Sequence, residues 1–311
     1  MAELLGDISG CHDYHLFLCN SGAEANENAL KMASFENGRK KIIAFKKAFH
    51  GRTSAAVNVT DSKGIQAPIN STFEVVYLPL NDFDALDNAF LDNDIAAVII
   101  EGIQGIGGIH IPDVAFLQKI STLCQASNTI LILDEIQSGF GRTGSIFAFE
   151  NLGIVPDILL VGKALGGGLP LGAFISHPKM MALLTESPVL GHITTFGGNP
   201  VSCAAGNAAL KVLQNSGWIK EVEAKENILL KEMNHPAIIN RTHKGLWMSL
   251  QFESDALAKK IAATCVANGI ITDWFLFAED KIRIAPPLCI SADELSTAIE
   301  KIKLSIDQSI Q

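Results

Sequence analysis

The chain has 311 residues, of which 48% are hydrophobic and 18% are charged, and its formal net charge is −9. This composition excludes disordered and collagen-like chains and argues against a broad basic surface for nucleic acid. No apolar run approaches the roughly 20 residues that span a bilayer, and the first residues lack the basic and apolar regions of a signal peptide. We therefore expect a globular, cytoplasmic protein of one or two domains that binds neither membranes nor nucleic acid.

Short apolar runs in the first two thirds of the chain predict the strands of one sheet. The runs are His15–Cys19, Lys41–Phe45, Glu74–Leu78, Ala96–Ile100, Ile130–Leu133, Ile158–Val161 and Gly172–Ser176. Continuous apolar runs of this kind are typical of strands that are covered on both faces. Segments of helical periodicity lie between them, and one of these places Ala25, Ala29, Leu30 and Ala33 on one face. The alternation to about residue 210 predicts an α/β fold with a mainly parallel sheet.

The pattern changes beyond Leu210. The predicted elements there are a polar helical region at 216–240, a strand at Trp247–Phe252, a helix at Ala256–Asn268 that ends at Gly269, a strand at Ile282–Ile284, and a last helix that begins with the capping box Ser291–Glu294. We expect a large α/β domain at 1–214 and a smaller α+β domain at 215–311.

Polar clusters follow five of the predicted strands. They are Asn20–Glu27, Ala48–Thr53, Glu101–Gly105, Asp134–Gln137 and Gly162–Lys163. One such cluster is most simply a polar loop. Ligands of open α/β sheets bind beyond the carboxyl ends of the strands, so five clusters at these ends predict a common binding site.

The chemistry of three clusters can be considered separately. Ser21, Gly22 and Ala23 stand where a strand turns into a helix, so they form either a phosphate site at the helix N-terminus or an ordinary N-cap with a turn glycine. Asp134 ends an apolar run, and a poorly solvated carboxylate needs a cationic partner such as a pyridinium N–H, unless it caps a helix. A Walker B strand is excluded, because the Gly162-Lys163 pair is followed by Ala164 and not by Ser or Thr.

Lys163 directly follows an apolar strand and is surrounded by glycines. Desolvation lowers the pKa of an amine and makes it a nucleophile toward carbonyl groups, whereas a loop lysine would simply extend into solvent. The six cysteines include no CxxC pair and the eight histidines no HExxH spacing. We therefore expect free thiols in a reducing compartment and no metal site.

Five ordered motifs together resemble the class III pyridoxal-phosphate aminotransferases. They are Ser-Gly-Ala-Glu-Ala-Asn-Glu, Phe-His-Gly-Arg-Thr, Asp-Glu-Ile-Gln, Gly-Lys-x-x-Gly-Gly-Gly-x-Pro and Thr-Thr-Phe-Gly-Gly-Asn-Pro. Within that class the chain is most similar to the acetylornithine and succinylornithine aminotransferases, from about residue 10 to the C-terminus. The resemblance implies the fold type I architecture, pyridoxal 5′-phosphate (PLP) as cofactor, and a homodimer with active sites at the subunit interface.

The resemblance also implies a role for each matching residue. Lys163 bonds to the cofactor and moves a proton, and Asp134 pairs with the pyridine nitrogen. The other cofactor-binding residues are Gln137 at the phenolic oxygen, Phe49 on the ring face, and Ser21, Gly22, Ala23 and the partner subunit's Thr195 at the phosphate. The substrate-binding residues are Arg52, Glu101, Thr194 and Arg283, of which Arg283 receives the α-carboxylate of glutamate. The alternative from the residues alone is a surface ion pair of the small domain for Arg283 and a salt bridge on a helix face for Arg52.

Two departures from the family pattern affect the substrate. The stretch Glu101-Gly-Ile-Gln-Gly-Ile-Gly-Gly has Ile106 where the family has a glutamate that screens the arginine matched by Arg283. The family also has a further segment before the Ser-Gly-Ala motif, which we expect to be absent here. We expect transamination of N-acetylornithine or N-succinylornithine with 2-oxoglutarate in arginine biosynthesis. The alternatives are another ω-aminotransferase (of ornithine or 4-aminobutyrate), an aminomutase, and an inactive truncated chain.

Overall fold

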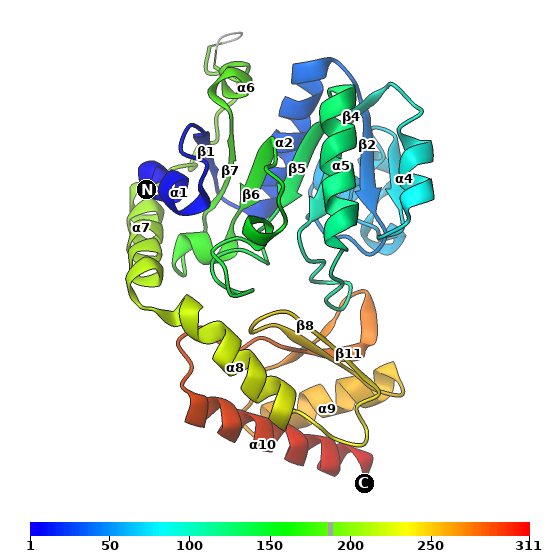
Figure 1. Ribbon diagram of the computed structural model, residues 1–311, viewed down its shortest axis with the longest axis vertical. Coiled ribbons are helices and arrows are strands. Elements are labelled where there is room, and N and C mark those ends of the chain that lie inside the picture. Colours follow the sequence, from blue (N-terminus) through cyan, green and yellow to red (C-terminus); the bar gives the residue numbers. More distant parts are fainter. Residues whose placement is uncertain (186–188) are drawn as a thin grey trace. The chain divides into compact units, whose positions relative to one another are not determined.

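The computed structural model describes residues 1–185 and 189–311, and the chain forms two compact units (Figure 1). The first unit contains Met1–Ile103, Ile111–Phe140 and Phe147–Asn215. The second unit contains Gln104–His110, Gly141–Ile146 and Ser216–Gln311. Two short segments from the first half of the chain therefore belong to the same unit as its C-terminal part.

Seven strands of the described residues form the sheet of the first unit, in the order β1-β7-β6-β5-β4-β2-β3. They are β1 (His15–Cys19), β2 (Lys41–Phe45), β3 (Val75–Leu78), β4 (Ile95–Glu101), β5 (Ile130–Asp134), β6 (Ile158–Val161) and β7 (Gly172–Ser176). β7 runs antiparallel to its neighbours β1 and β6, and the other pairings are parallel. The predicted α/β class with a mainly parallel sheet is confirmed.

Burial on both faces explains why the central strands are continuously apolar. Every residue of β4, β5, β6 and β7 is buried, and these strands lie in the middle of the sheet. The outer strands β1 and β3 are only half-buried. Burial of a strand therefore depends on its place in the sheet, and the outer strands β1 and β3 are less buried than the central ones.

Helices pack against this sheet and connect its strands. The α-helices of the first unit are α1 (Ala2–Ser9), α2 (Gly22–Asn37), α3 (Ser54–Asn58), α4 (Phe83–Ala89), α5 (Val114–Ser127), α6 (Pro178–Ala182) and α7 (Pro200–Asn215), and its 3-10 helices are η1 (Lys63–Ile65), η2 (Pro68–Asn70), η3 (Ala148–Asn151) and η4 (Lys163–Gly166). In Figure 1, α5 lies in front of β4 and β5. The predicted apolar face of α2 is confirmed, because Ala25, Ala29, Leu30 and Ala33 are buried in one core with residues of β4, β5 and β6.

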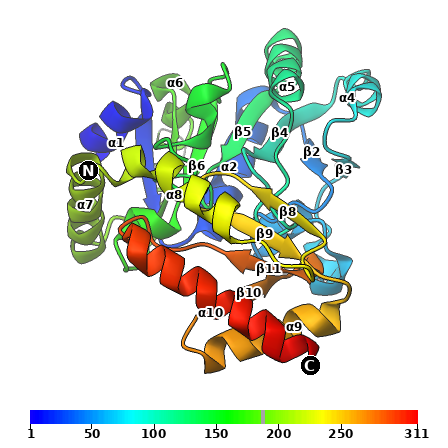
Figure 2. The same ribbon diagram turned by 60° about the horizontal axis from the view of Figure 1, so that its bottom comes forward.

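The second unit contains a four-stranded antiparallel sheet in the order β10-β11-β9-β8. Its elements are α8 (Trp218–Glu232), β8 (Asn240–His243), β9 (Met248–Gln251), α9 (Asp255–Ala267), β10 (Asp273–Phe275), β11 (Ala278–Ile284) and α10 (Ala292–Ile310). Figure 2 shows α9 and α10 packed side by side. The predicted capping box is present at α10, where Ser291 and Glu294 each bond to the other's backbone N–H. This unit contains Ser216–Gln311, within the α+β domain expected at 215–311, but also Gln104–His110 and Gly141–Ile146, which we expected in the large domain.

Candidate active site

The carboxyl ends of five strands lie at one edge of the first sheet. β1, β2, β4, β5 and β6 run in the same direction, because β1 and β6 are both antiparallel to β7 and the others pair in parallel. The last residues of β4 and β5, Glu101 and Asp134, are partners in register. The five predicted polar clusters therefore lie along one edge, as the sequence predicts.

The N-terminus of α2 lies at this edge with its backbone closely packed. Ser21 is an N-cap, since its hydroxyl accepts the Glu24 N–H at 3.2 Å. A Cβ on Gly22 would lie 2.7 Å from Cδ1 of Ile136, and one on Gly51, at φ +148, would lie 2.9 Å from the Ala23 side chain. The first N–H groups of a helix have no partner within the helix and favour anions. An N-cap at Ser21 and a phosphate site at the N-terminus of α2, the two alternatives predicted for Ser21, Gly22 and Ala23, are therefore compatible in one geometry.

Asp134 is buried, with its side chain 4% exposed, and is held by donors from three segments. Oδ2 lies 2.8 Å from Nδ1 of His50 and 3.3 Å from Nδ2 of Asn26, and Oδ1 accepts the Ile136 N–H at 3.0 Å. Sequence reasoning missed His50 and Asn26. Their positions in the sequence could have indicated them, because His50 follows Phe49 in its motif and Asn26 stands one helical turn beyond Gly22.

Glu101 is buried at the end of β4 beneath the Phe49 segment. Its Oε1 accepts the Phe49 N–H at 3.0 Å. The Phe49 ring is half-buried, and Cζ of the exposed Arg52 lies 5.8 Å from its centre. Glu101 therefore fixes the backbone that carries the two side chains predicted to meet cofactor and substrate.

Glu135 is a fully buried carboxyl beside the site. It accepts hydrogen bonds from the Ser138 hydroxyl at 2.5 Å and the Phe149 N–H at 2.9 Å. Burial raises the pKa of Glu135 from its ordinary value of 4.5 to about 7, against the opposing effect of these hydrogen bonds. This carboxyl holds the turn that carries Gln137, whose own side chain is half-buried.

Glu135 is expected to make stability depend on pH. Its pKa is higher in the folded chain than in the unfolded chain, so the folded chain binds the Glu135 proton more tightly. The contribution of this proton to the free energy of unfolding is fully present below pH 4.5 and is lost as the pH rises through about 7. The loss is on the order of 3 kcal/mol for a shift of this size. Glu135→Gln should therefore flatten the fall in melting temperature between about pH 5 and about pH 8, measured by circular dichroism. The exposed control Glu3→Gln should keep the wild-type slope, and parallel slopes for all three proteins would contradict the expectation.

Lys163 begins η4 directly after β6 and has a left-handed backbone, with φ 47. Non-glycine residues rarely adopt this conformation, and it is enriched at functional sites. The side chain is exposed, so this chain by itself does not supply the desolvation that the sequence suggests. Gly162 packs against Ile136, since a Cβ on Gly162 would lie 3.5 Å from Cγ2 of Ile136, and this contact brings the Lys163 loop to the Asp134 turn.

Thr194 and Thr195 lie in a segment that follows the undescribed residues. Thr194 donates its hydroxyl to the Leu18 carbonyl at 3.3 Å, near the end of β1, whereas Thr195 is exposed. Large apolar side chains of the same segment are also exposed, and they are Val189, Leu190, Ile193 and Phe196. Exposed apolar patches of this kind are typical of interfaces.

Arg283 lies on β11 in the second unit, with Nη2 3.9 Å from the Asp273 carboxylate. Arg142 of the same unit donates to the carbonyls of Leu246 and Pro286 at 2.8 and 2.6 Å. Burial, and then the charge of Arg283, lower the pKa of Arg142 to about 10. Two cations with a single weakly paired carboxylate form a region suited to an anion.

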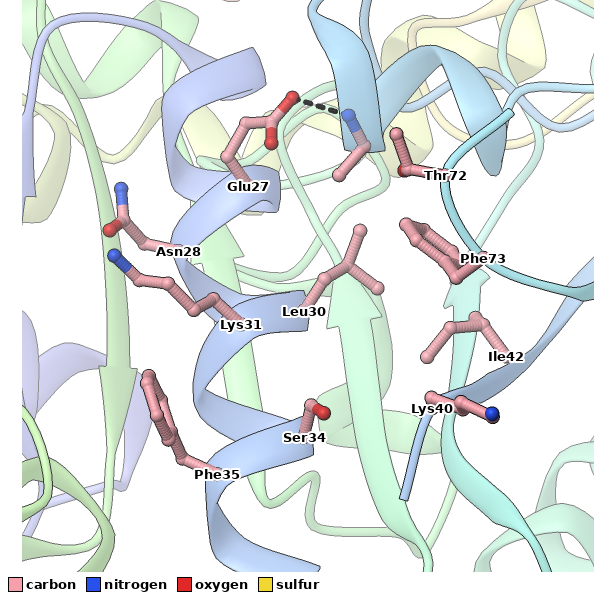
Figure 3. Close-up of a pocket in the computed structure, with 11 residues that line it drawn as sticks. Glu27, Asn28, Leu30, Lys31, Ser34, Phe35, Lys40, Ile42, Thr72 and Phe73 are labelled. Carbon is pink, nitrogen blue, oxygen red and sulfur yellow. Dashed lines mark hydrogen bonds between the residues drawn. The ribbon is translucent and has the colours of Figure 1, made fainter. Parts of the chain in front are cut away.

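A separate cavity of about 400 Å³ lies along the outer side of α2 (Figure 3). Its lining includes Leu30, Lys31, Ile42 and Phe73, and Figure 3 shows Glu27 at one end with its bond to a backbone N–H, that of Ala55. None of the predicted site residues is among its described lining residues. Over residues 1–185 and 189–311, the structure contains neither a group of three His, Cys, Asp or Glu that could hold a metal nor a helix long and apolar enough to cross a membrane.

Comparisons with known proteins agree with these features. The family model for aminotransferase class-III matches residues 1–306. The acetylornithine aminotransferases of Haemophilus ducreyi and Bacillus subtilis are 36% and 37% identical to this chain, over 96% and 94% of it and 76% and 75% of the relatives. The solved ornithine aminotransferase of Toxoplasma gondii, a structure with partial occupancy of PLP, is 29% identical with a TM-score of 0.89, over 100% of this chain and 77% of that one.

A second solved structure, an aminotransferase of Bacillus anthracis, is 25% identical with a TM-score of 0.89, over 99% of this chain and 79% of that one. The chain thus spans about three quarters of the length of these relatives. It belongs to the class III aminotransferases, which are PLP-dependent enzymes.

Proposed function

We propose that this enzyme transfers the terminal amino group of N-acetylornithine to 2-oxoglutarate in arginine biosynthesis. The observation that carries the chemistry is the sheet edge where buried Asp134 and the Lys163 amine leave the neighbouring strands β5 and β6. The choice of substrate rests on the two curated acetylornithine aminotransferases at 36% and 37% identity. We also propose that the enzyme works in the cytoplasm, where its scattered cysteines would remain reduced.

The residues at this edge fit PLP. A phosphate suits the helix N-terminus at Gly22 and Ala23, where the turn is packed so closely that a Cβ on Gly22 would overlap Ile136. A buried carboxylate such as Asp134 suits a protonated ring nitrogen. The polar atoms Nε2 of His50 and Oδ1 of Asn26 are buried without a partner among the described residues, so the surroundings of Asp134 are polar.

PLP, when bound, supplies an aldehyde that takes up an amino group and a ring that accepts the electrons of the adjacent C–H bond. Lys163 would hold the cofactor through its amine, and the same amine would carry the proton to and from the substrate carbon. Asp134 would keep the ring nitrogen protonated. Gln137 would donate to the phenolic oxygen, Phe49 would cover the ring, and Ser21 and the partner subunit's Thr195 would assist at the phosphate.

Arginines of this chain would hold the substrate carboxylates, since a guanidinium binds a carboxylate through two parallel hydrogen bonds. Arg283 would bind the α-carboxylate of glutamate, and Arg52 with Thr194 that of the acylated amino acid. Glu101 would act near the substrate through Phe49, whose N–H it accepts. The nearby Asp273 carboxylate is available to screen Arg283 in place of the family glutamate.

Free ornithine is the second candidate substrate. It is supported by the Toxoplasma gondii ornithine aminotransferase, with its TM-score of 0.89. Ile106, at the position of the family glutamate, weakens the assignment of an N-acylated ornithine. Steady-state kcat/KM for N-acetylornithine, N-succinylornithine, ornithine and 4-aminobutyrate, on one preparation with 2-oxoglutarate, separates the candidates. We expect N-acetylornithine to be at least about tenfold better than ornithine, since the acyl group, which ornithine lacks, adds contacts. Equal rates with all four amines would refute the assignment.

We further propose a homodimer in which each site takes Thr195 from the other subunit, as the exposed apolar segment around Thr195 suggests. Thr195→Glu would repel the phosphate and Lys163→Ala would remove the amine, so each variant alone should be inactive. Mixed subunits should regain about a quarter of wild-type activity, because half of the dimers then have one intact site of two. Activity and mass would be followed after dissociation and reassociation.

The matched control mixes Lys163→Ala with Asp134→Ala. Both residues belong to the same subunit's part of the site, so this mixture should stay inactive. Failure of the Thr195→Glu and Lys163→Ala mixture to regain activity, with a dimeric mass, would show that one chain supplies both residues.

A further inference from the structure

We propose that His50 and Asn26 are positioning residues for Asp134, which together fix its carboxylate toward the cofactor ring and couple it to the phosphate end of the site. The proposal rests on the proposed function, because it assigns the ring nitrogen as the partner of Asp134.

His50 is held rigidly where it meets Asp134. Its side chain is 0% exposed, and its Nδ1 lies 2.8 Å from Oδ2 of Asp134. The His50 N–H donates to Oγ1 of Thr60 at 2.9 Å, and that hydroxyl donates to the Ala56 carbonyl at 2.9 Å. An ionised carboxylate only accepts, so Nδ1 carries the proton in this pair. The imidazole thus reaches Asp134 from a backbone that is itself anchored.

Asn26 joins Asp134 to the first turn of α2. Its Nδ2 lies 3.0 Å from the Gly22 carbonyl and 3.3 Å from Oδ2 of Asp134. The Gly22 carbonyl belongs to the turn whose N–H groups would hold the phosphate. One amide group therefore connects the two ends of the proposed cofactor site.

Burial shows why these polar side chains need an explanation beyond packing. Nε2 of His50 and Oδ1 of Asn26 are buried without a hydrogen-bond partner among the described residues. An unsatisfied buried polar atom is destabilising, so apolar side chains of similar size would stabilise the core better. The benefit that offsets this cost is the pair of hydrogen bonds to Asp134. Both converge on Oδ2, and Oδ1 retains accepting capacity beyond the Ile136 N–H.

The test compares His50→Leu, which removes the donor, with His50→Asn, whose amide places an N–H close to the position of Nδ1. Removing a hydrogen bond to a charged group corresponds to about a 10- to 100-fold effect. We expect His50→Leu to raise the Kd for PLP about tenfold or more, to shift the pH dependence of the bound cofactor's visible absorbance, and to lower kcat. His50→Asn should restore all three to within about threefold of wild type.

Asn26→Leu extends the test to the other positioning residue. It should raise the Kd for PLP about three- to tenfold, because the phosphate turn and Asp134 are no longer joined. The matched control is Asn58→Leu, which removes another buried amide of the same unit, one that donates to the Phe73 carbonyl. This control should lower the melting temperature and leave the absorbance of bound PLP unchanged.

The outcomes separate this proposal from the proposed function. Wild-type protein that gives no visible absorbance with PLP would overturn the function itself. A wild-type protein that binds PLP, with His50→Leu matching it in Kd and spectrum, would overturn only the positioning role. A His50→Asn variant that is as impaired as His50→Leu would also overturn the positioning role, since that result would indicate that His50 contributes only through packing.

Discussion

Lys163→Ala is expected to lower kcat for transamination roughly 10⁴-fold or more, the upper end of what a positioned acid–base group contributes. Under the proposed function, the substitution removes both the amine that would bond to PLP and the group that would carry the proton. Alanine keeps the backbone of η4, so the loss should come from the side chain and not from a rearranged loop. The visible absorbance of bound PLP should also be lost or shifted, and stopped-flow mixing with an amine donor measures the remaining chemistry.

The control is Lys179→Ala, which removes an exposed lysine from α6 in the same unit. It should leave both absorbance and kcat within about twofold of wild type, as surface changes usually do. Retention of more than a few per cent of wild-type kcat in Lys163→Ala would mean that another amine carries the proton.

Asp134→Asn is expected to lower kcat by roughly 10² to 10³-fold, the usual effect of removing one preorganised electrostatic contact. Asparagine keeps the volume of the side chain, and its carbonyl can still accept from His50. The negative charge is lost, so under the proposed function the ring nitrogen would no longer be kept protonated and the ring would become a weaker electron acceptor. We expect a small change in the Kd for PLP and a large change in kcat, measured in the same titration and assay series.

A carboxylate at the opposite edge of the sheet provides the control. Asp157 immediately precedes β6, its carboxylate accepts the Leu131 N–H at 2.8 Å, and burial raises its pKa. Asp157→Asn should reduce stability and leave kcat unchanged, because its side chain is far along the strand from Lys163. A kcat for Asp134→Asn within about threefold of wild type would refute the role of the charge.

The apolar strands of the first unit could be predicted because burial on both faces leaves a continuous signal. β1, β2, β6 and β7 have the predicted bounds, and β5 differs only in including Asp134. That residue pairs with Leu160 through its backbone although its side chain is polar, so no composition signal marks it as strand.

Elements of the second unit were harder to predict because their strands are short or polar. β8, Asn240–His243, is exposed to half-buried, and it begins at the end of the 216–240 region that was expected to be helical. β10, Asp273–Phe275, was not predicted because it has only three residues and two of them are exposed, and only the last residues of β11 were expected. Antiparallel pairing stabilises these strands through their backbones, which leaves little trace in the side chains.

The sequence also indicates the edge at which the site lies but not how its side chains are held. A polar cluster that follows an apolar strand marks the carboxyl end of that strand, so Asp134 and Lys163 could be placed at one edge of the sheet. The partners of Asp134 could not, because Asn26 and His50 are ordinary polar residues until the fold buries them. Their roles remain predictions that the variants above address.

The alternation of the chain between its two units has a consequence for modular evolution. The chain passes from one unit to the other five times, since Gln104–His110 and Gly141–Ile146 belong to the C-terminal unit. These segments are bonded into it: the Gly108 carbonyl accepts the Thr242 hydroxyl at 3.0 Å, and the Ile106 carbonyl accepts the Phe277 N–H at 3.3 Å. A single crossover near residue 215 between two homologous genes would therefore combine a C-terminal unit from one parent with inserted segments from the other. Successful chimeras should be those whose parents agree at these segments, so the two units are expected to change together during descent.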